Sequence, residues 1–157
     1  MSLESAKNYL SRFNAAERIQ ELPASSATVA DAAQALKCKE EEIAKTLSFL
    51  VDDQVVLVVM AGDVKVSNPK FKQQFGKKPK MIKSDEVEAL TGHPPGGVCP
   101  FGVNEDAEIY LDESLKRFNK VYPACGSGSG NSAIEVTLEE LELFSQYKDW
   151  VDVAKTI

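Results

Sequence analysis

Hydrophobic residues recur at every third or fourth position in five segments, a spacing typical of amphipathic helices. We predict these helices over residues 2–13, 28–37, 67–75, 84–90 and 137–144. A serine or threonine begins each segment and can cap the free amide groups of the first turn. Two segments are marked more strongly, because Gly76 follows the third and Thr137 forms a capping box with Glu140 in the last.

Runs of β-branched and other apolar residues predict strands between the helices. The two longest, residues 43–51 and 54–61, are joined by Asp52 and Asp53, a pair suited to a hairpin turn. Shorter strands are expected at residues 18–22, 79–83, 108–111, 120–122, 133–136 and 150–153. Strands and helices interleave without a regular βαβ cycle. We therefore predict one α+β domain over residues 1–157, with a mixed and mostly antiparallel sheet curled into a partial barrel and surrounded by helices.

Composition narrows the possible chemistry. The chain has 157 residues, three cysteines and one histidine, which excludes a disulfide framework and any zinc site that needs two imidazoles. We expect reduced thiols, no metal and no cofactor. The longest apolar stretch, Val55–Ala61, is far shorter than a membrane span, and residues 1–14 lack the apolar core of a secretory signal. A cytoplasmic protein with no membrane partner is expected.

Charge is unevenly distributed along the chain. The formal net charge is −6, yet residues 64–83 contain seven lysines and no acidic residue, so the remaining residues carry −13. A local positive field in an acidic protein can attract a nucleic-acid backbone. A solvated, lysine-rich surface is the alternative.

Two glycine-rich segments could hold a ligand through backbone amides. Residues 92–102 contain four glycines and three prolines, so amides can approach an oxyanion while the prolines restrict the unbound loop. A tight structural loop is the alternative. Residues 125–132 lack the glycine order of a nucleotide-binding motif. We expect a flexible rim there, in which Asn131 and Ser132 can donate hydrogen bonds to a substrate.

Single residues add two further candidates. Lys45 interrupts an apolar strand. Facing inward, its ammonium needs a partner or a function, whereas facing outward it would be an edge charge that opposes aggregation. Cys99 and His93 could be a nucleophile and its base, although their spacing in a proline-rich loop does not specify contact. Otherwise His93 packs on proline and Cys99 is a small, semi-buried side chain.

Together these segments resemble the YbaK and prolyl-tRNA-synthetase-associated (ProX-like) editing domains. The resemblance rests on Ser25–Val29 at a helix start, Ile43–Leu47 on a strand, the loop of residues 92–102 and the late Gly-Ser segment. It implies a mixed α+β domain around a barrel-like sheet. It also implies hydrolysis of mischarged aminoacyl-tRNA, by free-standing proteins in trans or by insertions in prolyl-tRNA synthetase.

The resemblance assigns roles to individual residues. It places the catalytic lysine at Lys45. Substrate-binding positions fall on Gly96, Gly97, Val98, Cys99, Pro100, Phe101 and Gly102, and on Gly128, Gly130, Asn131 and Ser132, where this chain carries an extended Gly-Ser run. For contact with the tRNA acceptor stem we select Lys70, Lys72, Lys77, Lys78 and Lys80.

We therefore expect a trans-acting aminoacyl-tRNA deacylase that removes alanine, cysteine or serine from tRNA-Pro. Its partners would be mischarged tRNA and prolyl-tRNA synthetase. Two alternatives remain open. One is a non-catalytic module that binds aminoacyl-tRNA or a synthetase, and the other is a small hydrolase that uses Cys99 as its nucleophile.

Overall fold

The computed structural model describes residues 2–22, 29–94, 98–127 and 131–157. Its α-helices are α1 (Ser2–Ser11), α2 (Val29–Leu36), α3 (Asn68–Phe75), α4 (Ser84–Thr91) and α5 (Leu138–Ser145), and its 3₁₀ helices are η1 (Ala16–Arg18), η2 (Glu40–Glu42) and η3 (Glu113–Arg117). Its strands are β1 (Gln20–Glu21), β2 (Ile43–Val51), β3 (Gln54–Ala61), β4 (Val64–Val66), β5 (Glu108–Asp112), β6 (Lys120–Ser127), β7 (Asn131–Ala133), β8 (Val136–Thr137), β9 (Asp149–Val151) and β10 (Ala154–Thr156).

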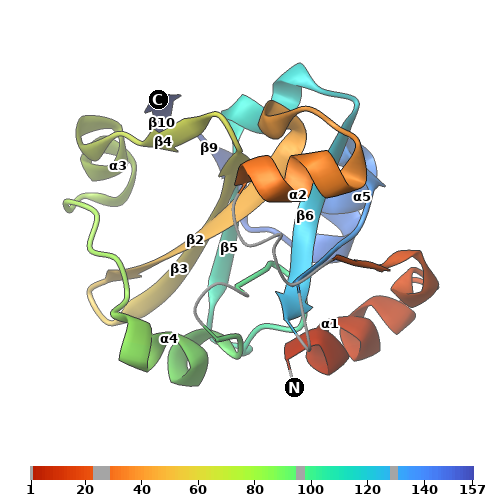
Figure 1. The fold of residues 1–157 in the computed structure, drawn as a ribbon. Coiled ribbons are helices and arrows are strands. Elements are labelled where there is room, and N and C mark those ends of the chain that lie inside the picture. The colour runs from red at the N-terminus through yellow and green to blue at the C-terminus, as the bar shows by residue number, and fades with distance from the viewer. Residues whose placement is uncertain (1, 23–28, 95–97, 128–130) are drawn as a thin grey trace.

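The β2–β3 hairpin forms the centre of the sheet (Figure 1). Asp52 and Asp53 both have positive φ, 48° and 67°, which is the backbone that a two-residue type I′ turn requires. Every side chain of β3 from Val55 to Ala61 is at most 4% exposed, which explains why this strand is continuously apolar. The predicted hairpin is confirmed, with the predicted bounds for both strands.

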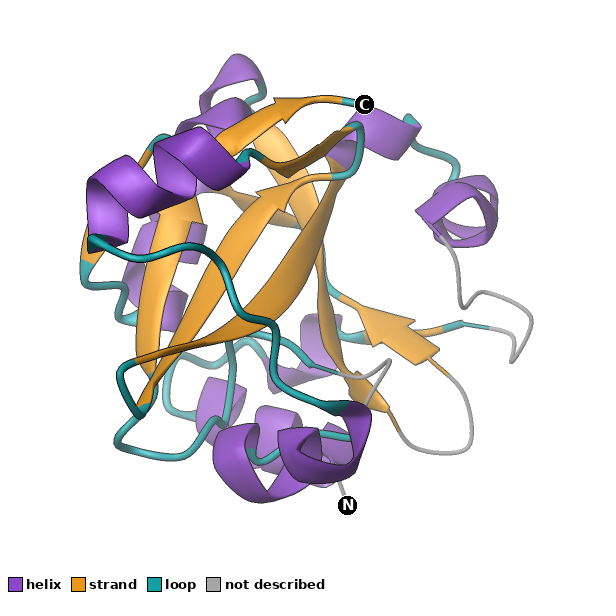
Figure 2. Cartoon of the chain, turned by 90° about the vertical axis from the view of Figure 1, so that its left-hand side faces the viewer, coloured by secondary structure: helices purple, strands orange, loops and turns teal. Residues whose placement is uncertain are grey.

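The main sheet combines parallel and antiparallel pairs. Its order is β1-β7-β6-β2-β3-β5-β9, with β8 beside β6. Strand β2 is antiparallel to β3 but parallel to β6, and β5 is parallel to both β3 and β9. The strands curve into an incomplete barrel with helices around it (Figure 2), and β4 pairs with β10 in a separate ribbon. The predicted α+β fold with a mixed, curled sheet is confirmed.

Helix ends follow the sequence signals closely. The Ser67 hydroxyl accepts a hydrogen bond from the first turn of α3, and Gly76, with a φ of 81°, ends that helix. Thr137 and Glu140 form the predicted capping box at α5. Helix α3 is anchored to the hairpin by Phe71, whose fully buried ring lies 4.7 Å from the ring of Phe49.

The shorter strands differ from the prediction. Residues 79–83, all of them described, form no strand. Met81 makes only a single bridge to Phe49, flanked by hydrogen bonds from the Leu50 amide to the Lys80 carbonyl and from the Ile82 amide to the Ser48 carbonyl, which is too short a pairing to form a ladder. Residues 18–22 contribute only the two-residue β1. Residues 133–136 divide between β7 and β8, and residues 150–153 end in the turn between β9 and β10. Strand β4 was not predicted at all.

Two cap assignments also change. The residue that caps α4 is Lys83, not Ser84, and its side chain makes no capping hydrogen bond. Thr28, the expected cap of α2, lies outside the described residues. The acidic side chains Asp85 and Glu86 in the first turn of α4 still favour the positive end of the helix dipole.

Gly102 joins the glycine-proline loop to α1 through a close backbone approach. Its φ is +71°, and a Cβ added to it would lie 2.6 Å from the carbonyl oxygen of Ser5. Gly76 has a similar φ of +81° but has no atom within 4 Å of an added Cβ. Both glycines would impose backbone strain on another residue, but only Gly102 would add steric crowding. Comparing substitutions at the two positions therefore distinguishes these two effects.

We predict that Gly102→Ala destabilises the protein more than Gly76→Ala does. The left-handed backbone costs alanine about 1 kcal/mol at either position, and the overlap with Ser5 should add about 1 kcal/mol or more at position 102. Urea unfolding of both variants measures the difference in the free energy of unfolding. Equal losses would show that the contact with α1 yields without cost.

Candidate functional site

Lys45 is the third residue of β2 and shares its strand face with Leu47 and Phe49. Its side chain is half-buried, and its Nζ donates a hydrogen bond to the carbonyl oxygen of Val64. Burial lowers the pKa of Lys45, and the nearby Asp63 carboxylate opposes that shift. The lysine is thus neither a fully buried charge nor an exposed edge charge. It is a partly desolvated amine with one fixed acceptor.

The turn between β3 and β4 leads directly to that acceptor, the first residue of β4, and is held from two sides. Arg117 of η3 donates to both carboxylate oxygens of Asp63, at 2.6 and 3.0 Å, and this interaction lowers the pKa of Asp63. The Ser114 hydroxyl accepts the amide of Ala61 at 3.1 Å. Any side chain at Gly62 would overlap the carbonyl oxygen of Glu40. The position of the Val64 carbonyl, and so of the Lys45 amine, is therefore closely constrained.

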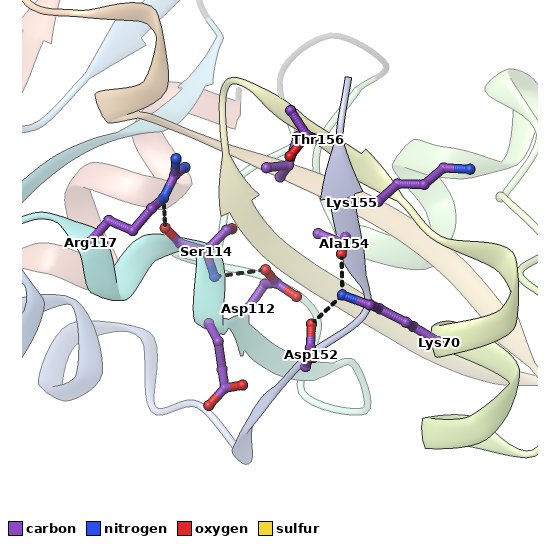
Figure 3. A pocket seen from close by; sticks show the side chains of 10 residues that line it. Lys70, Asp112, Ser114, Arg117, Asp152, Ala154, Lys155 and Thr156 are labelled. Carbon is purple, nitrogen blue, oxygen red and sulfur yellow. Dashed lines mark hydrogen bonds and ion pairs between the residues drawn. The ribbon is translucent and has the colours of Figure 1, made fainter.

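A cavity of about 510 Å³ lies on the η3 side of this turn (Figure 3). Most of its charged groups have a partner, but Lys155, which also lines it, has no ion pair with any other described residue. Lys70 donates to Asp152 at 3.0 Å and to the Ala154 carbonyl at 2.9 Å, and Asp112 accepts the amides of Ser114 and Val153, both at 2.9 Å. Lys70 and Arg117 in the lining are therefore occupied, whereas the charge of Lys155 is available to an anion.

The glycine-proline loop fixes its side chains in the core. Gly96 and Gly97 lie outside the described residues. Val98 is half-buried, while Cys99, Pro100 and Phe101 are buried. The Phe101 ring stacks on Tyr9 of α1 at 6.3 Å. Because these side chains point into the protein, a ligand can meet this part of the loop chiefly through its backbone.

His93 and Cys99 lie in contact, which their spacing did not predict. Nε2 of His93 is 2.7 Å from the carbonyl oxygen of Phe101 and 3.4 Å from Sγ of Cys99, and Sγ is 3.3 Å from the same oxygen. Burial lowers the pKa of His93. A carbonyl only accepts hydrogen bonds, so Nε2 carries a proton and has no lone pair for the Cys99 thiol. This geometry does not form the nucleophile and base of a Cys99 hydrolase.

Lys45 and the described part of the loop are bound to different elements. The Lys45 amine contacts Val64 at the start of β4, whereas Phe101 and Gly102 contact α1. Gly128 and Gly130 lie outside the described residues, and the backbone of Asn131 begins β7. Ser132 is buried in β7 opposite Glu21.

The five selected lysines are all exposed, but they are not equally available. Lys70 is bound to Asp152, and Lys77 forms an ion pair with Asp52. Lys72, Lys78 and Lys80 have no ion pair with any other described residue. The available positive charge therefore lies at the end of α3 and in the segment that follows it.

Two site features were not singled out in the sequence. Asp63 follows Gly62 directly after a strand, which is a turn signal, but its partner Arg117 is 54 positions away and has no local signature.

Among the described residues, no group of three or more His, Cys, Asp and Glu side chains is arranged to hold a metal ion. The described helices are also too short or too polar to cross a membrane.

Comparisons with known proteins agree along nearly the whole chain. YwhH, an uncharacterized protein of Bacillus subtilis (strain 168), is 50% identical over 156 residues, which are 99% of this chain and 98% of that protein. The proline–tRNA ligase of Shouchella clausii (strain KSM-K16) is 34% identical over 101 residues, 64% of this chain and 17% of the ligase.

A solved structure and a family model indicate the same class of protein. A crystal structure of a candidate trans-editing enzyme for prolyl tRNA synthetase has a TM-score of 0.88 and 28% identity, and the match covers 98% of this chain and 97% of that one. The family model for the aminoacyl-tRNA editing domain matches residues 24–144, a range that includes Lys45, the glycine-proline loop and the lysine-rich segment. The chain belongs to the aminoacyl-tRNA editing domain family.

Proposed function

We propose that this protein is a trans-acting deacylase that hydrolyses the ester bond of mischarged aminoacyl-tRNA. The observation that carries the proposal is Lys45, a partly desolvated lysine on a rigid central strand, held by a single backbone acceptor. The family supplies the substrate class. The likeness to part of a proline–tRNA ligase and to a candidate trans-editing enzyme supports tRNA-Pro as the tRNA. We propose alanine, cysteine or serine as the amino acid that is removed.

Hydrolysis of the ester passes through a tetrahedral oxyanion. Water adds to the carbonyl carbon, the bond to the ribose oxygen breaks, and the ribose hydroxyl regains a proton. An ammonium has three donors, and the bond to Val64 uses one of those on Lys45. Two donors remain for the oxyanion. A donor of this kind typically contributes about 3 kcal/mol to lowering the barrier.

The glycine-proline loop would add backbone donors to the same oxyanion. Its buried side chains hold the described backbone in place, so little order is lost when a substrate binds. Proton transfer is assigned to water or to the neighbouring ribose hydroxyl. In this scheme the protein acts mainly by positioning the ester and stabilising its developing charge.

Selectivity would come from a pocket that admits a small amino acid and excludes proline. Pockets that differ by one or two carbons discriminate by about 10- to 200-fold, so contacts with the tRNA must contribute as well. Lys72, Lys78 and Lys80 are the proposed phosphate contacts because they are exposed and their charges are available. Prolyl-tRNA synthetase is a proposed partner because it would release the mischarged tRNA.

We predict that Lys45→Ala lowers the single-turnover rate of deacylation by about 100-fold or more, the usual effect of losing one oxyanion donor. The substrates are tRNA-Pro charged with alanine, cysteine, serine or proline. Lys65→Ala, at an exposed position on β4, is the matched control and should retain the wild-type rate. Full activity in a folded Lys45→Ala protein would remove the catalytic role, and tight binding without turnover by the wild type would indicate a recognition module.

We predict that Lys78→Glu combined with Lys80→Glu weakens binding to tRNA-Pro by about tenfold or more. The slope of log affinity against log salt should fall by about 2, because two phosphate contacts are lost. The control is Lys7→Glu on α1 combined with Arg12→Glu directly after it, which changes the net charge equally; α1 lies across the molecule from α3 (Figure 1). Equal effects of the two pairs would indicate a response to net charge alone.

We predict that Asp63→Asn lowers the pKa of Lys45 further. The substitution removes the carboxylate that favours the ammonium and leaves Arg117 without that partner. Reductive methylation with 13C-formaldehyde and an NMR titration measures the lysine directly. Asp52→Asn removes the partner of Lys77 instead and should leave Lys45 unchanged. An unchanged or raised pKa in Asp63→Asn would contradict the assigned electrostatics.

A further inference from the structure

His93 is the single histidine of the chain, and it lies at the start of the glycine-proline loop. Its side chain is completely buried. Its imidazole reaches forward to the carbonyl oxygen of Phe101, 2.7 Å from Nε2. One side chain therefore joins the two ends of the loop.

Other hydrogen bonds also hold the two ends of the loop. The Cys99 thiol also lies within hydrogen-bond distance of the Phe101 oxygen, at 3.3 Å, so two donors converge on one carbonyl. The Thr91 hydroxyl accepts the backbone amide of His93 at 3.1 Å and donates to the Val87 carbonyl at 2.8 Å. The beginning of the loop is thus tied to α4 and its end to His93.

Core packing alone does not account for a histidine at this position. A buried imidazole costs more to desolvate than a leucine of similar size unless its nitrogens are bonded. The charged and titratable groups near it are Glu88 of α4 and Cys99. Burial lowers the pKa of His93, and the donor role toward Phe101 needs only the neutral ring.

The bond to Phe101 fixes more than one atom. In a trans peptide the carbonyl and the following amide hydrogen point in opposite directions. Holding the Phe101 carbonyl against His93 therefore also sets the direction of the Gly102 amide. The positive φ of Gly102 and its contact with Ser5 fix the next peptide. Together these constraints hold the backbone at Phe101 and Gly102.

We propose that His93 is a positioning residue, which as a neutral Nε2–H donor to the Phe101 carbonyl holds the backbone of the substrate-binding loop in the arrangement that deacylation requires. The catalytic part of this inference rests on the proposed function. The loop-fixing part does not, so the two can be tested separately.

The first test measures the tautomer and the order of the loop without any substrate. Because the chain has one histidine, 15N-histidine labelling gives one pair of imidazole signals. The expected result is the neutral Nε2–H tautomer at pH 7. His93→Leu should increase hydrogen exchange of the amides of Val98, Cys99, Phe101 and Gly102 by about tenfold or more, with β3 unchanged. An Nδ1–H tautomer, or unchanged exchange in the loop, would overturn the proposal.

The second test compares His93→Leu with His93→Gln in deacylation of mischarged tRNA-Pro. Leucine has no donor, whereas the glutamine amide can reach the Phe101 carbonyl. We expect kcat to fall by about tenfold or more in His93→Leu with KM within about threefold of wild type, and His93→Gln to recover most of that loss. Ser145→Ala, at another buried polar position, should leave both constants unchanged.

The outcomes separate the two claims. Variants that lose stability equally but keep the wild-type kcat per folded molecule would reduce His93 to a core residue. If the wild type has no deacylase activity, the proposed function fails. The exchange and tautomer results then still decide whether His93 fixes the loop.

Discussion

The antiparallel ladder between β2 and β3 is the constraint on which the rest of the structure depends. It runs without interruption from Ala44 opposite Ala61 to Val51 opposite Gln54. Strand β6 pairs with the other edge of β2, and β5 pairs with the other edge of β3. A slip of one residue would move Lys45 to the opposite face of the sheet. The turn of Asp52 and Asp53 and the burial of β3 therefore fix the place of the lysine.

Lys45 and the glycine-proline loop are held in place in two different ways. Lys45 is positioned by a strand and by a turn that Arg117 and Asp63 secure, so its stiffness comes from the sheet. The glycine-proline loop has no ladder. It is held by buried side chains and by the carbonyl of Phe101, on which His93 and Cys99 converge. Hydrogen-bond donors that are already fixed need little reorganisation when charge develops on a substrate. Both arrangements provide such donors.

Features set by local sequence could be predicted, and features set by long-range contact could not. The hairpin, the Ser67 cap, the Gly76 terminus and the capping box of α5 each depend on residues within a few positions, and all were predicted correctly. Strands β4 and β10 are only three residues long, and they pair with each other although they are far apart in the sequence. The pairing of Lys70 with Asp152 likewise joins distant segments. The proposed role of Lys45 comes from the family resemblance, and its environment comes from the structure.

The proposed mechanism requires that Lys45 and the glycine-proline loop act on the same aminoacyl group, although they are held by different elements. The direct measurement is NMR with a tRNA-Pro acceptor-stem mimic that carries alanine through a non-hydrolysable 3′-amide. The protein would carry 13C-methylated lysines and 15N-labelled amides. We expect the Lys45 signal and the amide signals of Val98, Cys99, Phe101 and Gly102 to shift together with the same Kd, while the Lys148 signal does not shift. Perturbation of the loop alone, or of Lys45 alone, would contradict the proposed mechanism.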